Sequence, residues 1–110
     1  MSFEIIATPR FSKDIKKLAK KYTSLRTEFS KLLDGLASNP KQGTSLGNEC
    51  YKIRLAIASK GKGKSGGARI ITNIVISDGI VYLLTIYDKS EKENVSDKEL
   101  KELLAQLADE

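Results

Sequence analysis

The spacing of apolar residues divides the chain into two kinds of segment. In two segments apolar residues recur every three or four positions, which places them on one face of a helix. The first series is Phe11, Ile15, Leu18 and Tyr22, and the second is Leu25, Phe29, Leu32, Leu33 and Leu36. Thr8-Pro9 suits a helix start, and Asn39-Pro40 suits a helix end. The short joint near Thr23-Ser24 therefore predicts an antiparallel helical hairpin.

Other segments are typical of strands. Short apolar or alternating runs predict strands at 3–7, 50–57, 69–76 and 80–87. Asp78-Gly79 separates the last two runs, and this dipeptide is a strong hairpin signal. Residues 40–49 are expected to form a loop. Ser96 and Glu99 fit a capping box before a final helix whose apolar face carries Leu100 and Leu103.

These elements predict an α+β fold in the order β-α-α-β-β-β-α. A three-stranded antiparallel meander and the first strand would form a small sheet packed on the N-terminal helical hairpin, followed by a C-terminal helix. At 110 residues, without an internal repeat or a long linker, the chain is expected to form a single domain over residues 1–110.

Composition narrows the candidate chemistry. The chain has one cysteine and no histidine, so neither an intrachain disulfide nor an ordinary zinc site is expected, and no cofactor is predicted. It lacks an apolar run of the ~20 residues that a membrane span needs, so a cytoplasmic protein without a membrane partner is expected. Residues 1–87 contain 15 Lys and Arg against 6 Asp and Glu, whereas residues 88–110 contain 4 against 8. A basic body indicates an anionic partner, with nucleic acid the leading candidate and a solubilising surface the alternative.

The cations concentrate around one predicted strand. Between Cys50 and Ile57 apolar residues alternate with Lys52 and Arg54, which predicts a half-buried strand with two cations on its open face. A glycine-rich loop with Lys60, Lys62 and Lys64 follows. Arg69 then enters the next strand, where it is expected at the surface. Tyr87 and Lys89 leave the strand after that, so the meander would place them near Arg69. This arrangement indicates a polyanion site, and RNA is the working hypothesis.

The chain resembles the RelE/ParE superfamily of toxins from type II toxin–antitoxin systems, in particular its HigB-like branch. The resemblance rests on four motifs in order: Thr8-Pro9, Cys50-Tyr51-Lys52-Ile53-Arg54, the lysine–glycine run from Lys60 to Arg69, and the run from Tyr82 to Lys89. It implies a RelE-like fold and a ribosome-dependent mRNA endonuclease that needs no metal and inhibits translation. It also implies a cognate antitoxin, normally of the helix-turn-helix type in this branch.

The resemblance assigns catalytic positions to Lys52, Arg54, Arg69 and Lys89. RNA cleavage by its own 2′-hydroxyl needs a base, relief of charge on the phosphorane, and an acid for the leaving oxygen. Arginine holds its proton, so Arg54 and Arg69 suit phosphate clamps. Neighbouring cations lower a lysine pKa, which makes Lys52 the candidate base. Lys89 or Arg54 is then the candidate acid or charge stabiliser.

Binding residues are expected beside this centre. Lys60, Lys62 and Lys64 would contact the backbone of mRNA or ribosomal RNA, or else form a solubilising loop. RelE-like enzymes often carry a tyrosine beyond the last strand, but the matching region near Val95 has none. Tyr87 either supplies the stacking surface instead or is a strand residue half-buried against the last helix.

Two other functions share this fold. A ParE-like toxin inhibits DNA gyrase and has no nuclease centre, and the cationic cluster argues against it. The departure at the tyrosine position leaves a second alternative, a non-catalytic module that binds RNA or an antitoxin.

Overall fold

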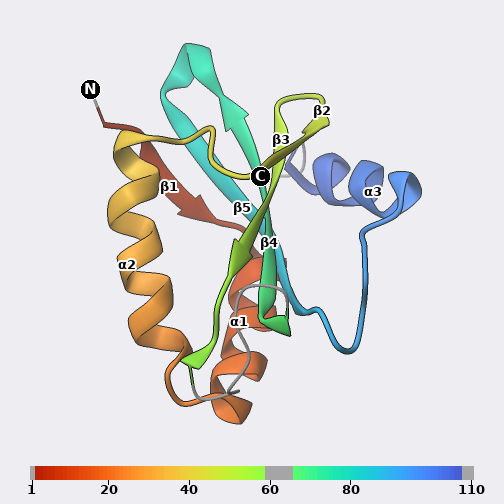
Figure 1. Cartoon of the computed structure of the whole chain (residues 1–110). Helices are drawn as coiled ribbons and strands as arrows, with labels where there is room; N and C mark the ends of the chain where they lie inside the picture. Colours follow the sequence, from red (N-terminus) through yellow and green to blue (C-terminus); the bar gives the residue numbers. More distant parts are fainter. Residues whose placement is uncertain (1, 59–65, 108–110) are drawn as a thin grey trace.

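The computed structural model describes residues 2–58 and 66–107, and this part of the chain contains three α-helices and five strands (Figure 1). In chain order the elements are β1 (Glu4–Ala7), α1 (Pro9–Lys21), α2 (Leu25–Ser38), β2 (Thr44–Gly47), β3 (Cys50–Leu55), β4 (Ala68–Val75), the 3-10 turn η3 (Ile76–Asp78), β5 (Ile80–Asp88) and α3 (Asp97–Leu107).

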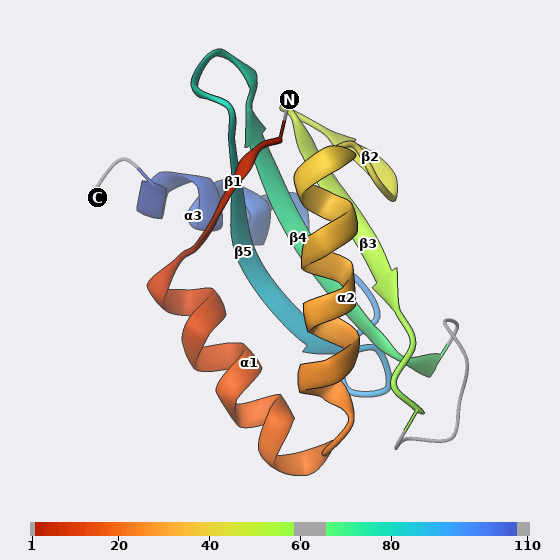
Figure 2. The same cartoon turned by 90° about the vertical axis from the view of Figure 1, so that its left-hand side faces the viewer.

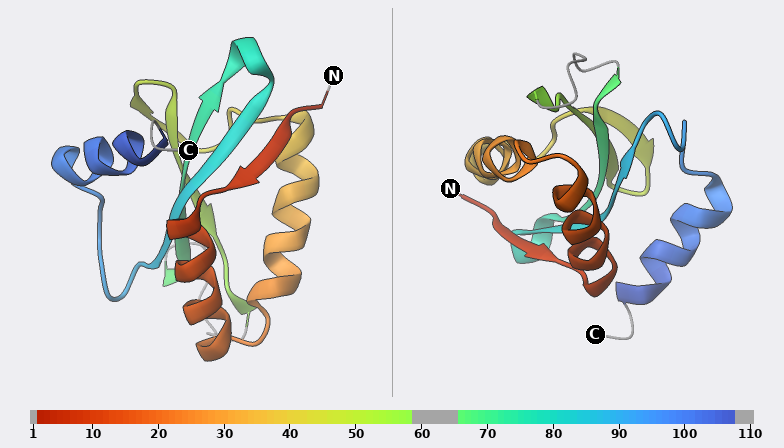
Figure 3. Two further views of the ribbon diagram at one scale, coloured as in Figure 1. Left: turned by 180° about the vertical axis from the view of Figure 1, so that it is seen from behind. Right: turned by 90° about the horizontal axis from the view of Figure 1, so that it is seen from below.

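The five strands form one sheet in the order β1-β5-β4-β3-β2. β1 runs parallel to β5, and the other neighbouring pairs are antiparallel. α1 and α2 lie on one face of the sheet, and α3 lies on the opposite face (Figure 2). The view from below shows the same three layers (Figure 3). The predicted α+β class is thus confirmed, although the parallel β1–β5 pair makes the sheet mixed rather than wholly antiparallel.

The additional strand β2 lies where the sequence predicted only a loop. It pairs with β3 through a two-residue turn, Asn48-Glu49, between the paired residues Gly47 and Cys50. Both turn residues have positive φ, 54° and 59°, as the turn types that match strand twist require. The prediction of a loop over residues 40–49 is therefore wrong for Thr44–Gly47. A four-residue edge strand with one apolar residue carries too little periodicity to be recognised.

Each face of the sheet buries its own apolar cluster. The larger cluster fills the space under α1 and α2 and includes Phe11, Leu25, Leu36, Ile53, Ile70, Val81, Leu83 and Ile86. The smaller cluster lies under α3 and consists of Cys50, Ile71, Leu84, Tyr87, Leu100 and Leu103. α3 consequently packs on the sheet face that sequence analysis expected to be open and cationic.

A β-bulge reverses the direction of the side chains midway along β5. Ile71 of β4 lies opposite Thr85, but the next residue, Thr72, lies opposite Leu83, so Leu84 is an extra residue. Before the bulge Leu83 faces the α1–α2 cluster, and after it Ile86 does. The single inserted residue therefore turns Thr85 and Tyr87 toward the α3 face.

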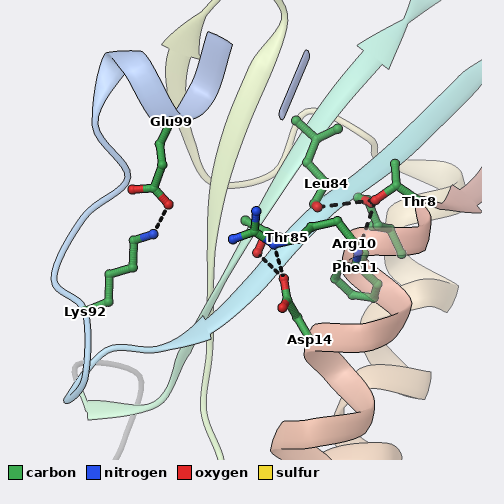
Figure 4. Close-up of polar contacts among 9 residues, drawn as sticks. Thr8, Arg10, Phe11, Asp14, Leu84, Thr85, Lys92 and Glu99 are labelled. Carbon is green, nitrogen blue, oxygen red and sulfur yellow. Dashed lines mark hydrogen bonds and ion pairs between the residues drawn. The ribbon is translucent and has the colours of Figure 1, made fainter. Parts of the chain in front are cut away.

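Thr8 holds this bulge in place from the start of α1. Its backbone N–H donates to the Leu83 carbonyl at 3.1 Å, and its hydroxyl donates to the same carbonyl at 3.0 Å and to that of Leu84 at 3.3 Å. The Thr8 hydroxyl also accepts from the Phe11 N–H at 3.1 Å, which caps the helix (Figure 4). Because Thr8 is buried, water cannot replace these bonds. One side chain thus joins the first helix to the irregular point of the sheet.

Replacement of Thr8 by valine keeps the side-chain shape but removes the hydroxyl. The Phe11 N–H would lose its acceptor, so we expect Thr8→Val to lower the free energy of unfolding by about 1–2 kcal/mol. The exposed helical residue Thr27 provides the matched control. Urea denaturation of Thr8→Val and Thr27→Val checks this, and equal stabilities of the two variants would contradict the assigned role.

Candidate active site

Three strands contribute side chains to one transverse row on the α3 face. Arg54 of β3 lies opposite Arg69 of β4, and Arg69 lies opposite Tyr87 of β5. Directly opposed residues of antiparallel strands point to the same face, and adjacent strands are about 4.8 Å apart. Lys52 precedes Arg54 by two residues and therefore lies on this face as well. The fold brings these four predicted residues together. We call the group of three cations and Tyr87 the cationic row.

Lys89 lies just beyond the end of β5. Its backbone N–H donates to the Gly67 carbonyl at 3.1 Å, which continues the ladder past Arg69 and Tyr87. Its backbone is therefore at the end of the sheet where the cationic row lies. The role of Lys89 stays a prediction.

Arg69 is buried, contrary to the expected surface position. Only 3% of the residue is exposed, and its Nη1 donates to the Ala68 carbonyl at 3.0 Å. Burial and, after it, the positive charge of Arg54 lower the pKa of Arg69, while Tyr87 acts in the opposite direction. An arginine nevertheless remains a cation at neutral pH. The alternation pattern could not reveal this burial, because it gives the face of the sheet on which a side chain lies and not what covers that face.

Tyr87 is also covered, and its ring belongs to the apolar cluster with Leu100 and Leu103 of α3. Lys92 Nζ lies 5.6 Å from the ring centroid. The buried hydroxyl has no hydrogen-bond partner in the described part of the chain. Burial raises the pKa of Tyr87, and the nearby Arg69 opposes this shift. The structure therefore matches the second of the two expectations for Tyr87. Stacking on a base stays a prediction that requires the ring to be uncovered.

The segment between β5 and α3 adds two contacts that sequence analysis missed. Lys52 Nζ donates to Asn94 Oδ1 at 3.0 Å, so the candidate base is held by an amide oxygen. Lys92 forms an ion pair with Glu99 of α3 (Figure 4). The Ser96 hydroxyl accepts from the Glu99 N–H as a capping box predicts, but the Glu99 carboxylate contacts Lys92. This ion pair joins the segment to α3.

The predicted RNA-binding lysines Lys60, Lys62 and Lys64 lie outside the described residues. The connection re-enters the described part before Gly67, which lies against the end of β3. A Cβ atom at Gly67 would be 2.1 Å from the Leu55 carbonyl oxygen. Only glycine fits this close approach, so Gly67 has a structural reason as well as any role in binding.

The cationic row is bordered by two depressions. One, of about 350 Å³, lies at the edge of β3 and is lined by Lys52, Arg54 and the Gln42–Thr44 segment. The other, of about 380 Å³, lies between α1 and β5 and includes Tyr87 in its wall. A chain crossing the sheet along the row would meet both, which suits an extended ligand rather than a compact one.

In the ranges 2–58 and 66–107, no group of three or more His, Cys, Asp and Glu side chains could hold a metal ion. Nor does any helix in these ranges have the length and apolar character needed to cross a membrane.

Comparison with known families places the chain in a class. The family model described as the RelE toxin of the RelE/RelB toxin–antitoxin system matches residues 10–110. Since the match covers most of the chain, this protein belongs to the RelE family of toxins. The prediction that the chain is a RelE/ParE-superfamily toxin of a type II toxin–antitoxin system is confirmed. Its assignment to the HigB-like branch stays a prediction.

Solved structures share the fold at low sequence identity. The isolated RelE toxin of E. coli is 17% identical, with a TM-score of 0.62 over 96% of this chain and 99% of that one. A mutant of the same toxin in the free state is 16% identical, with a TM-score of 0.62 over 96% and 98%. RelE in the intact E. coli RelBE toxin–antitoxin complex is 20% identical, with a TM-score of 0.63 over 79% and 96%.

Tyr87 and the partly buried Tyr22 give opposite predictions. Tyr87→Phe removes a buried hydroxyl that has no partner among the described residues, so we expect the free energy of unfolding to rise by about 1 kcal/mol. Tyr22→Phe is the control, because its hydroxyl donates to the buried carboxylate of Asp88 at 2.7 Å. That variant should be less stable than the wild type by about 1–2 kcal/mol. Thermal and urea denaturation check both, and an equal loss in the two variants would refute the account of Tyr87.

Proposed function

We propose that this RelE-family toxin cleaves mRNA on the ribosome and thereby inhibits translation, with a cognate antitoxin as its partner in the cytoplasm. The observation that carries the proposal is the cationic row on one face of the sheet. Two arginines lie directly opposite each other there, with a lysine two residues away. Like charges at directly opposed positions are unfavourable, and a phosphate between them would relieve the repulsion.

The proposed reaction follows from these residues. The 2′-hydroxyl oxygen attacks the adjacent phosphorus, a 2′-O–P bond forms, and the bond from phosphorus to the 5′-oxygen breaks. Lys52 would take the hydroxyl proton, and Lys89 would protonate the departing 5′-oxygen. Arg54 and Arg69 would stabilise the charge on the phosphorane oxygens. Neither step requires a metal or a cofactor.

Two covering contacts set conditions for this reaction. The Lys52 ammonium, which a 2′-hydroxyl would approach, is hydrogen-bonded to Asn94, and α3 covers Tyr87. Bound RNA would therefore replace the Asn94 contact. The E. coli toxin has been crystallised with its antitoxin RelB, and we propose that an antitoxin likewise binds this chain. Its helix-turn-helix type is a prediction from the HigB-like resemblance. The sequence of the protein encoded by the adjacent gene tests this prediction.

Arg54 provides the sharpest test because, unlike Arg69, it is exposed. We expect Arg54→Ala to reduce cleavage of ribosome-bound mRNA by about 100-fold or more, since it removes a group that stabilises transition-state charge. Arg26→Ala on the exposed surface of α2 removes the same charge elsewhere and should cleave like the wild type. Primer extension on messages in a purified translation system measures both.

The same assay separates the alternatives. Inhibition of DNA gyrase by the wild type, with messages left intact, would favour a ParE-like toxin. Binding to ribosomes without any cleavage would favour a non-catalytic module of the same fold.

The lysine loop allows an independent prediction. Substitution of Lys60, Lys62 and Lys64 together by glutamine should weaken ribosome binding, because phosphate contacts release counterions. The slope of log K against log salt concentration should decrease in magnitude by about 2. Substitution of Lys31, Lys98 and Lys101, which are exposed on other elements, gives a variant of equal charge. If both triple variants have the same slope, the loop has no specific binding role.

A further inference from the structure

The pocket between α1 and β5 contains a carboxylate that the proposed reaction does not use. The pocket has a volume of about 380 Å³, within the usual range for small-ligand sites, and Asp14 of α1 contributes to its wall. Arg10, Lys17, Thr85 and Lys92 also line it. The wall also contains Lys21 with two further carboxylates, Asp88 and Glu91, and both of these form ion pairs with Lys21.

Two donors hold Asp14, and both contact the same oxygen. The Thr85 hydroxyl donates to Asp14 Oδ2 at 2.6 Å, and Arg10 Nε donates to Oδ2 at 3.1 Å (Figure 4). In the described part of the chain no donor contacts Asp14 Oδ1. The carboxylate is therefore fixed in direction, with one oxygen left to accept a hydrogen bond. Its side chain is 24% exposed, so a ligand in the pocket can reach it.

The pocket adjoins the cationic row through β5. Thr85 precedes Tyr87 by two residues on the same face, so the two are about 7 Å apart along the strand. Tyr87 in turn lies opposite Arg69. A phosphate held by Arg54 and Arg69 thus leaves a neighbouring nucleotide within reach of the pocket. Lys17 and Lys92 would complement the charge of the RNA backbone there.

We propose that this pocket receives the base of a nucleotide next to the cleaved phosphate and that Asp14 selects bases with an exocyclic amino group. The inference rests on the proposed function, since it assigns a specificity contact to the same RNA site. Adenine, cytosine and guanine can each donate from an amino group to Asp14 Oδ1. Uracil has no amino group, and its single ring N–H lies between two carbonyl oxygens that the carboxylate repels. Proteins that read RNA by sequence use such contacts to the edges of unstacked bases.

RNA suits the pocket better than a basic side chain of a protein partner. The free oxygen of Asp14 alone would accept either ligand. The lining, however, has four cations, Arg10, Lys17, Lys21 and Lys92, against three carboxylates, Asp14, Asp88 and Glu91. This excess of positive charge would repel a second cation and attract a nucleotide phosphate. The charge balance at the pocket rim therefore favours a nucleotide.

Binding of nucleotides tests the inference without any cleavage. The isolated protein is titrated with AMP, CMP, GMP and UMP while the amide resonance of Thr85 is followed by NMR. We expect the three amino-bearing nucleotides to bind about five- to tenfold more tightly than UMP. Asp14→Asn should remove this preference, because an amide group accepts and donates with similar ease. Thr85→Val should weaken the preference, because it frees the carboxylate to rotate.

Asp34→Asn provides the matched control, since Asp34 is an exposed carboxylate on α2. It should keep the wild-type preference. Equal affinity of the wild type for all four nucleotides would overturn the inference and leave Asp14 to a basic side chain of a partner. So would a preference that persists in Asp14→Asn.

Mapping of cleavage sites then separates this inference from the proposed function. On ribosome-bound messages the wild type should cut with a bias against uracil at one position beside the cut, and Asp14→Asn should lose that bias. If the wild type shows the nucleotide preference but cleaves no message, the proposed function fails and the pocket assignment stands. If the wild type cleaves messages but shows no base preference in the binding assay or in the cleavage map, the pocket assignment alone is overturned.

Discussion

The extra residue in β5 is the constraint on which the arrangement of the site depends. Side chains alternate strictly along a strand, so without the bulge at Leu84 the residue at position 87 would face α1 and α2. With the bulge, Tyr87 faces α3 and joins Arg54 and Arg69 in one row. Thr8 binds the carbonyls of Leu83 and Leu84, so the start of α1 fixes the point at which the alternation changes. The register of β1 with β5 ends at Leu83, so Thr85 lies at the edge of β5, where its hydroxyl reaches Asp14 of α1.

The cationic row costs stability in the absence of a ligand. Arg54 and Arg69 carry like charges at directly opposed positions, and Arg69 is buried as well. The buried hydroxyl of Tyr87, which has no partner within residues 2–58 and 66–107, adds a second unfavourable feature on the same face. Such features persist where surrounding structure over-determines them, and they concentrate at functional sites. The helical hairpin provides that structure, because its larger apolar cluster holds β3, β4 and β5 in register from the opposite face.

Local patterns in the sequence were sufficient to predict the helices, the strands β1 and β3 to β5, and the α+β class. Helical periodicity and alternation identify elements whose one face is buried, and the Thr8-Pro9 pair identified the start of α1. Features that depend on contacts between distant segments were not predictable in this way. β2 lacks a pattern, the bulge shows no local signal, and alternation along β4 does not show that Arg69 is buried. The contact between Lys52 and Asn94 joins residues 42 positions apart. The contact between Asp14 and Thr85 joins residues 71 positions apart.

The central claim is that one face of this sheet cleaves RNA by internal attack of the 2′-hydroxyl. Analysis of the fragment ends from ribosome-bound mRNA tests it most directly. Our account predicts upstream fragments that end in a 2′,3′-cyclic phosphate and downstream fragments that begin with a 5′-hydroxyl, because phosphorus exchanges its 5′-oxygen for the 2′-oxygen of the same strand. Fragments with a 5′-phosphate, or messages that remain intact beside the active wild-type toxin, would contradict it.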